Sequence, residues 1–195
     1  MCSGYRNRNR YNSLRYAGRD YSRPGKYFVT ICTAQKTEWF GSVINSKMQL
    51  SEIGHIASQM WFEMPVHFPF IGLDAFVVMP NHIHGIILIN RVEALHATPL
   101  HPHDATPLHP HDATPTLPHY ATHHANETMS SISPKSGSLS VVVRSYKSAV
   151  TKHAHKLESS FSWQRGFYDN IICTPGQMSR IRKYISDNAQ NWDNN

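Results

Sequence analysis

Long hydrophobic runs are missing from this sequence of 195 residues. The longest ones, residues 76–79 and 85–89, are far shorter than the roughly 18 to 20 apolar residues that cross a bilayer. No apolar stretch with a small-residue cleavage site follows the charged N-terminus, so no secretory signal is expected. We therefore expect a protein without a membrane span and with a cytoplasmic location.

Cysteine is scarce as well. Cys2, Cys32 and Cys173 are odd in number and widely spaced, which excludes a framework of disulfides and a zinc site built on paired thiolates. With 40% hydrophobic residues, the chain is nevertheless long enough to bury a core of its own.

Acidic residues are outnumbered by basic ones. The formal net charge is +6, and residues 1–26 carry seven Lys or Arg against a single acid, Asp20. We interpret this segment as a basic N-terminal arm whose natural partner is a polyanion, because each phosphate that a protein neutralises releases counterions. A tail that only keeps the protein soluble is the alternative.

A proline-rich repeat interrupts the chain. From Ala97 the unit ATPLHPHD occurs twice, followed by the degenerate copy ATPTLPHY, and six of the twelve prolines lie there. Proline at this density removes backbone donors and fixes extended conformations, so we interpret residues 92–134 as a disordered insertion in a domain of residues 27–195. The histidines of the repeat leave metal binding open, as an alternative to a repeat that a loop merely tolerates.

Periodicity outside the insertion predicts the secondary structure. Strands are expected over residues 27–34, 73–79, 82–89 and 163–173, which are rich in β-branched and aromatic residues. A first amphipathic helix begins after Ser51 and ends at Pro65, a second carries an apolar stripe over residues 139–150, and a third begins at Thr174 and extends to Trp192.

The order of these elements predicts an α+β fold of the ferredoxin-like type. In this fold, a βαββαβ chain forms a four-stranded antiparallel sheet backed by two helices, and here one more helix is added at the C-terminus. Because the fold serves many unrelated functions, the function has to be argued from the site.

The segment Pro80-Asn81-His82-Ile83-His84-Gly85 is the sharpest local feature. Alternate side chains of a strand share a face, so His82 and His84 point the same way while Ile83 points into the core. Two imidazoles in this arrangement can hold one divalent ion, although two surface histidines are the plainer interpretation. On the last helix, Tyr184 and Asn188 are four residues apart and should be neighbours on one flank.

Taken together, these features resemble the HUH superfamily of single-strand DNA endonucleases, within it the single-tyrosine transposases, and most of all the REP-associated tyrosine transposases. The matching stretches are YFVTICT (27–33), FVVMPNHIHGII (76–87), WQRGFYDNII (163–172) and RIRKYISDNAQNW (180–192). With the linking helices, they cover nearly all of the chain outside the insertion.

The resemblance implies a metal-dependent transposase that cleaves and rejoins single-stranded DNA at palindromic hairpin elements. His82 and His84 match the metal-binding histidines, Tyr184 matches the nucleophile, and Asn188 matches a polar ligand for which relatives often have glutamine. Imidazoles, an amide and waters suit Mg²⁺, with Mn²⁺ as a substitute. A tyrosine nucleophile would keep the energy of the broken bond in a 5′-phosphotyrosine and release a free 3′-hydroxyl.

Several alternatives stay open at this point. Tyr168 is a rival nucleophile, although the family assigns its strand a structural part. The pattern also fits a domesticated protein that binds hairpin DNA without cleaving it, and relatives include both monomers and swapped homodimers. The expected DNA contacts are Arg15, Arg19, Arg23, Lys147 and Lys152.

Overall fold

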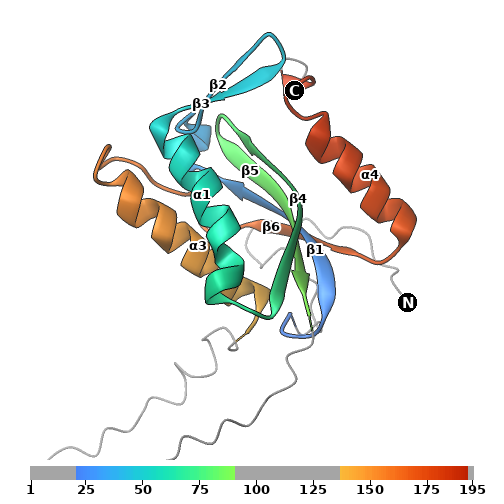
Figure 1. Ribbon diagram of the computed structural model, residues 1–195. Helices are drawn as coiled ribbons and strands as arrows, with labels where there is room; N and C mark the ends of the chain where they lie inside the picture. Colours follow the sequence, from blue (N-terminus) through green and yellow to red (C-terminus); the bar gives the residue numbers. More distant parts are fainter. Residues whose placement is uncertain (1–20, 91–136, 193–195) are drawn as a thin grey trace, which may run out of the picture. The chain divides into compact units, whose positions relative to one another are not determined.

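The computed structural model describes residues 21–90 and 137–192 (Figure 1). Within these ranges, one sheet has the strand order β4-β5-β1-β6, and every neighbouring pair is antiparallel. The predicted α+β fold with a four-stranded antiparallel sheet is thereby confirmed. The predicted insertion at residues 92–134 and most of the basic arm lie outside the described residues. The strands of the sheet are β1 (Gly25–Cys32), β4 (Ile71–Met79), β5 (His82–Ile89) and β6 (Tyr168–Ile172).

Alternation along β1 divides the sheet into two faces. Tyr27, Val29 and Ile31 are fully buried on the first face, whereas Phe28 and Thr30 point to the second. Directly opposed residues of an antiparallel pair share a face, so the register of β1 with its neighbours carries this division across the whole sheet.

Two helices, α1 (Glu52–His67) and α3 (Leu139–Ala154), lie side by side and cover the first face (Figure 1). The hydroxyl of Ser51 accepts a hydrogen bond from the N–H of Gly54 and caps α1, as its sequence predicts. The rings of Trp61 and Tyr146 meet edge to face with centroids 5.5 Å apart, and Trp61 stacks on Phe76 at 4.6 Å. This layer contains the main hydrophobic core.

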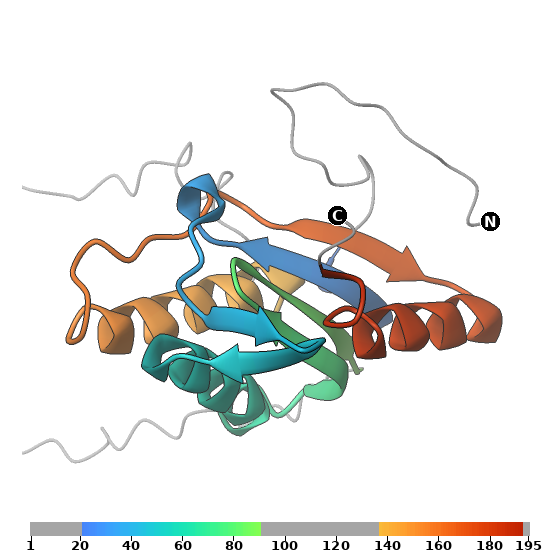
Figure 2. The same ribbon diagram turned by 90° about the horizontal axis from the view of Figure 1, so that it is seen from above.

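The helix α4 (Pro175–Ser186) packs on the second face, apart from α1 and α3 (Figure 2). Its start agrees with the prediction, because Thr174 and Gln177 form a reciprocal capping box and Pro175 occupies the first turn. Its buried side chains belong to a small cluster that is separate from the main core and consists of Ile86, Ile172, Met178 and Ile185.

The end of α4 differs from the prediction. The helix stops at Ser186, and the N–H of Asn188 turns back to the carbonyl of Ile185. Asp187 and Asn188 have side chains that compete with helical backbone bonds, which favours termination here. The prediction that Asn188 and Trp192 continue the helix is therefore wrong: Asn188 lies in the turns that follow α4, and Trp192 comes after them in a 3₁₀ conformation.

Three short elements between β1 and α1 have no counterpart in the predicted order. They are the 3₁₀ helix η1 (Ala34–Lys36) and a hairpin of β2 (Gly41–Ile44) and β3 (Lys47–Leu50). The hairpin turn holds Asn45 and Ser46 at φ 52° and 59°, the left-handed pair that a two-residue hairpin loop needs. Asn-Ser is a weaker signal for such a turn than Asn-Gly, so the sequence pattern misses it.

Two predicted boundaries are also wrong. The helix α1 passes through Pro65, because a proline so near the C-terminus removes one helical hydrogen bond while the N–H of Phe68 still bonds the carbonyl of Met64 at 2.9 Å. The strand β6 begins at Tyr168, whereas Trp163 makes only an isolated bridge with Thr33. In the parts of the chain that the structure describes, no helix is both long and apolar enough to span a membrane.

Candidate metal and tyrosine site

His82 and His84 lie side by side on the second face of β5. Pairing with β1 places them opposite Cys32 and Thr30, and Ile83 between them is fully buried in the main core. The Nε2 atoms of the two imidazoles are 3.0 Å apart. The structure thus brings the two predicted metal ligands together.

The outer nitrogen of each ring has its own partner. His82 Nδ1 is 2.8 Å from Asn81 Oδ1, and because an amide oxygen only accepts, this nitrogen carries the ring proton. His84 Nδ1 is 2.9 Å from the hydroxyl of Thr30, which can accept or donate. When Thr30 donates, His84 Nε2–H bonds to His82 Nε2. When Thr30 accepts, both Nε2 lone pairs face the same point, as cation binding requires.

Both imidazoles are neutral at pH 7. Burial lowers the pKa of His82 to about 4, and the positive charge of Lys36 contributes to this shift. Burial also lowers the pKa of His84 to about 3, with His82 as the second cause. Because a histidine must be unprotonated to bind a metal, neither ring has to release a bound proton to a metal at neutral pH.

The phenol of Tyr184 joins this pair from α4. Its oxygen is 3.3 Å from His84 Nε2, and its ring meets the His84 ring with centroids 5.2 Å apart. Phe28 lies beneath both, stacked on His84 at 5.2 Å and edge-on to Tyr184 at 6.1 Å. Tyr184 remains 49% exposed, so the nucleophile proposed from the sequence is within reach of a substrate.

After α4, Trp192 contacts the site, whereas Asn188 makes no hydrogen bond to either imidazole among the described residues. Asn188 is buried, with 4% of its surface exposed, although it is not on the helix that carries Tyr184. The indole of Trp192 stacks on His82 with centroids 5.8 Å apart and planes 30° apart. In the sequence, Trp192 is only the predicted end of the last helix, and its contact with His82 depends on how the chain turns after Ser186.

Hydrogen bonds from Thr33 and Phe40, which no sequence pattern predicts, hold the turn before His82. The backbone N–H of Thr33 donates to the carbonyl of Asn81 at 3.0 Å, and the N–H of Phe40 donates to the carbonyl of Pro80 at 3.0 Å. The hydroxyl of Thr33, which is fully buried, also lies 2.9 Å from the carbonyl of Asn81. These contacts join segments that are far apart in the sequence, so no local motif predicts them.

The residues predicted to contact DNA are dispersed. Arg15 and Arg19 lie outside the described residues, whereas Arg23 and Lys152 are exposed. Lys147 is half-buried, and its Nζ donates to the carbonyls of Gln164 at 2.7 Å and Gly166 at 2.9 Å. Burial lowers the pKa of Lys147. Its contacts hold the loop that leads into β6.

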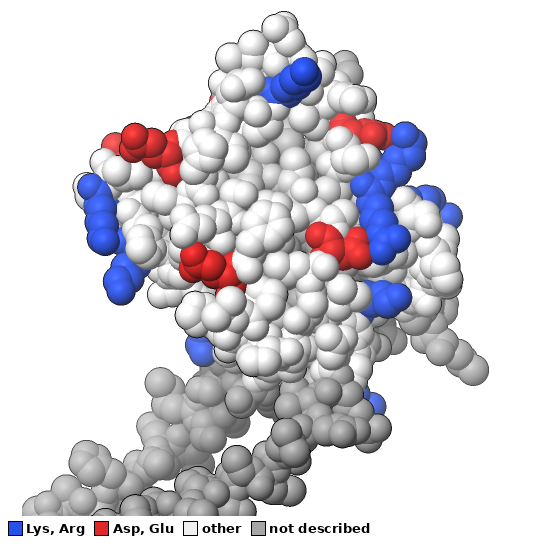
Figure 3. All heavy atoms as spheres, in the orientation of Figure 1, with Lys and Arg blue, Asp and Glu red and all other residues white. Residues whose placement is uncertain are grey.

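Charge on the outer surface gathers along α4. In the view of Figure 3, Lys and Arg side chains are most numerous at the side occupied by α4, with further ones at the opposite edge, and acidic side chains lie between them. The exposed basic residues of α4 are Arg180, Arg182 and Lys183.

Tyr168, the rival nucleophile, lies on β6 opposite Thr30. Its phenol is 43% exposed and accepts a hydrogen bond from Gln164 Nε2 at 3.0 Å. Unlike Tyr184, it has no hydrogen bond to either imidazole among the contacts of the described residues.

The spacing of the two imidazoles suits an octahedral ion. Two ligand atoms that are each about 2.1 Å from one ion and at right angles around it lie about 3 Å apart, and the two Nε2 atoms are 3.0 Å apart. Residues 21–90 and 137–192 contain no group of three or more His, Cys, Asp or Glu side chains suited to a metal. Two imidazoles occupy only two positions of an octahedral ion, and the others can take water or substrate.

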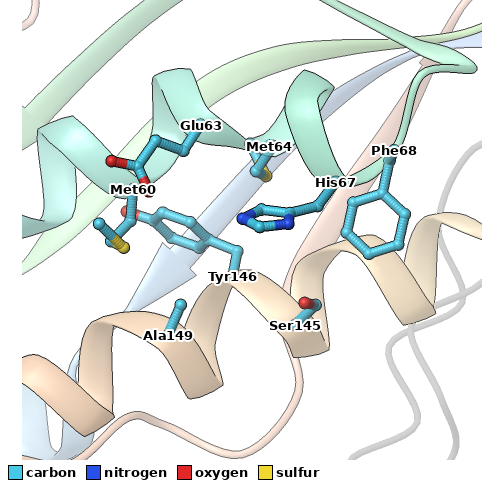
Figure 4. A pocket seen from close by; sticks show the side chains of 8 residues that line it. All are labelled: Met60, Glu63, Met64, His67, Phe68, Ser145, Tyr146 and Ala149. Carbon is cyan, nitrogen blue, oxygen red and sulfur yellow. The ribbon is translucent and has the colours of Figure 1, made fainter.

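A hollow lies between α1 and α3, away from these groups (Figure 4). Glu63, His67 and Ser145 supply its polar atoms, and Tyr146 forms part of its wall. The hydroxyl of Tyr146 donates to the carbonyl of Ala57 at 2.9 Å. Because none of the site residues lines this hollow, it is a gap between packed helices rather than part of the site.

Comparison with known proteins supports the fold and adds one relative. No family model matches the chain. A protein of Haemophilus influenzae, described as uncharacterized, is 34% identical over 183 residues, which is 93% of this chain and 89% of the relative. The solved structure of a REP-associated tyrosine transposase bound to a REP hairpin has a similar fold, with a TM-score of 0.53 and 15% identity. The similarity covers 91% of this chain and 73% of the transposase.

Proposed function

The chain belongs to the same family as the Haemophilus influenzae protein to which it is 34% identical, and we propose that it is a transposase that cleaves and rejoins single-stranded DNA. Tyr184 is the covalent nucleophile in this proposal. A hairpin is the proposed substrate, because the solved transposase of similar fold is bound to one.

One observation carries the proposal. The oxygen of an exposed tyrosine lies 3.3 Å from the nearer of two neutral imidazoles whose Nε2 atoms are 3.0 Å apart. A nucleophile next to a cation-binding pair is what attack on a phosphodiester requires, because the phosphate is anionic and its leaving group is poor. In this proposal the chain acts as a monomer, which is supported by the contact of Tyr184 with His84 within one chain.

His82, His84 and Asn188 would hold Mg²⁺, or Mn²⁺ in its place. The bound ion would polarise a non-bridging phosphate oxygen and neutralise charge that develops in the transition state. Asn81 keeps the His82 ring in the tautomer with an unprotonated Nε2, and Thr30 does the same for His84 when its hydroxyl accepts from Nδ1–H.

The chain's own residues account for the transfer step. The phenolic oxygen of Tyr184 forms a bond to phosphorus as the phenol loses its proton, and the bond from phosphorus to the 3′ oxygen breaks. The proton released by the phenol passes through solvent to the leaving oxygen, which becomes a free 3′-hydroxyl. Because the phosphotyrosine keeps the bond energy, a 3′-hydroxyl can attack it and reseal the strand. In this proposal, Arg15, Arg19, Arg23, Lys147 and Lys152 contribute to holding the DNA.

Capture of the covalent intermediate tests the proposal. A hairpin-bearing single strand is labelled at its 3′ end, since a 5′-phosphotyrosine keeps the downstream fragment on the protein, and it is incubated with the full chain and Mg²⁺. Wild-type protein should carry the label on a denaturing gel. Tyr184→Phe should lose the label but still bind the hairpin, whereas Tyr168→Phe, the matched control, should retain both properties.

Two results would contradict this function. Label that persists in Tyr184→Phe and vanishes in Tyr168→Phe would move the nucleophile to β6. Hairpin binding without any adduct in Mg²⁺ or Mn²⁺ would replace the transposase by a DNA-binding protein that no longer cleaves.

A further inference from the structure

The tyrosine helix is attached to the rest of the domain by little buried surface. Met178 and Ile185 are its buried side chains, and they pack in the small cluster with Ile86 and Ile172 rather than in the main core. Few buried apolar contacts allow an element to open or shift at low free-energy cost. Polar contacts at the edges of α4 can therefore decide where Tyr184 lies.

A β-bulge in β4 faces this helix. Leu73 is paired with Ile87 and Phe76 with Gly85, so two residues of β4 oppose the single residue Ile86. Leu73 and Phe76 both pack on the main core, and the two bulge residues between them, Asp74 and Ala75, are turned toward α4. In a regular strand one of them would face the core.

The bulge residue Asp74 forms a two-pronged ion pair with Arg182 of α4. Nε of Arg182 donates to Oδ1 at 2.8 Å, and Nη2 donates to Oδ2 at 2.7 Å. The Asp74 side chain is 19% exposed and that of Arg182 is 53% exposed. Hydrogen bonding by Arg182 lowers the pKa of Asp74, so the carboxylate is ionised at neutral pH.

The position of this pair around the helix bears on Tyr184. Successive residues of a helix are about 100° apart, which places Arg182 and Tyr184 on opposite flanks of the buried stripe of Met178, Ile181 and Ile185. One flank is fastened to β4 by Asp74, and the other meets His84. A helix that is held on both flanks cannot roll about its apolar stripe.

We infer that Asp74 and Arg182 are positioning residues that set the rotation of α4 and thereby hold the phenol of Tyr184 against His84. This role rests on the proposed function only as far as the phenol is the nucleophile. The placement of the helix itself can be measured without any reaction. The β4 bulge then has a purpose, because it turns the carboxylate of Asp74 toward the guanidinium of Arg182.

The test compares two arginines of the same helix. Arg182→Gln and Asp74→Asn each remove the ion pair, whereas Arg180→Gln removes the same charge from an exposed arginine for which the described residues show no ion pair. Hydrogen exchange of the α4 amides should become about two- to fivefold faster in the first two variants, because solvent screens an ion pair at this exposure. Exchange in β1 and β5 should stay as in wild type, and Arg180→Gln should behave as wild type throughout.

Rescue and reaction rate separate positioning from mere stability. The charge swap Asp74→Arg with Arg182→Asp should restore slow exchange of α4. In the labelled-strand assay, Arg182→Gln should form the adduct about tenfold more slowly at unchanged hairpin affinity, and the swap should recover most of this loss.

Exchange and adduct rates that are equal in Arg182→Gln and Arg180→Gln would overturn the inference, and so would a swap no better than Arg182→Gln. If wild-type protein forms no adduct, the proposed function fails. The exchange measurement alone then decides the role of the ion pair.

Discussion

Replacement of Gly85 by alanine should destabilise the domain strongly, although it adds a single methyl group. A Cβ at Gly85 would lie 2.3 Å from Cζ2 and 2.5 Å from Cη2 of Trp61. Carbon atoms in contact are about 3.5 to 4.0 Å apart, so Trp61 or β5 would have to move by about 1 Å or more.

Neither partner can move freely. Trp61 is fully buried between the rings of Phe76 and Tyr146, and β5 is paired on both sides, with β1 and β4. Overpacking of this kind costs about 1 to 3 kcal/mol and in rigid surroundings more. The loss of glycine's backbone entropy offsets at most about 1 kcal/mol of this. We expect a net loss of about 2 to 3 kcal/mol, or roughly 5 to 10 °C in Tm for a chain of this size.

Urea unfolding and calorimetry of the full chain measure this loss. Gly176→Ala is the matched control, because a Cβ there meets no atom within 4 Å and the residue lies in the first turn of α4. That substitution should be neutral or stabilise by up to about 1 kcal/mol. Trp61→Phe removes the indole atoms that the added methyl group would meet. It should destabilise the domain on its own and reduce the additional cost of Gly85→Ala.

Two results would refute this reasoning. Equal unfolding free energies for Gly85→Ala and wild type would mean that Trp61 is not fixed where the structure places it. Additive effects of Gly85→Ala and Trp61→Phe would mean that the alanine is costly for another reason than contact with the indole.

The other predictions concern the two imidazoles. Without metal, the free energy of unfolding should fall as the pH drops from about 6.5 toward 4, by up to about 1.4 kcal/mol per pH unit for each ring. The sign follows because burial lowers the pKa of His82 to about 4 and of His84 to about 3, so the unfolded chain binds more protons in this range. Urea unfolding at pH 7 and pH 5 checks this, and an undiminished pH dependence in a variant with both histidines changed to asparagine would contradict it. Mn²⁺ binding can be measured by electron paramagnetic resonance. It should be lost in His84→Ala and weakened about tenfold in Asn188→Ala. Unchanged binding in Asn188→Ala would remove Asn188 from the ligand set.

Local pattern and tertiary structure contribute differently to the site. The period of two in β5 predicts that His82 and His84 share a face and that Ile83 points inward, and the structure agrees. Capping residues likewise predict the starts of α1 and α4. These predictions succeed because side-chain direction in a strand and the satisfaction of the first N–H groups of a helix depend on neighbours along the chain.

The predictions that fail concern the ends of elements and short irregular ones. The hairpin of β2 and β3 has too weak a turn signal, and α1 passes through a proline where the pattern ends it. The helical spacing assumed for Tyr184 and Asn188 does not apply, since α4 ends at Ser186. At such positions, propensities of similar size compete and packing decides between them.

By itself, the sequence determined the order of the four sheet strands and the three long helices, the shared face of His82 and His84, and the helix that carries Tyr184. Only the tertiary structure decided that the phenol reaches His84, that Asn81 and Thr30 hold the outer ring nitrogens, and that a bulge turns Asp74 toward Arg182. The physical reason is range: periodicity and capping are properties of adjacent residues, whereas these contacts depend on strand register and helix rotation, which packing between distant segments sets.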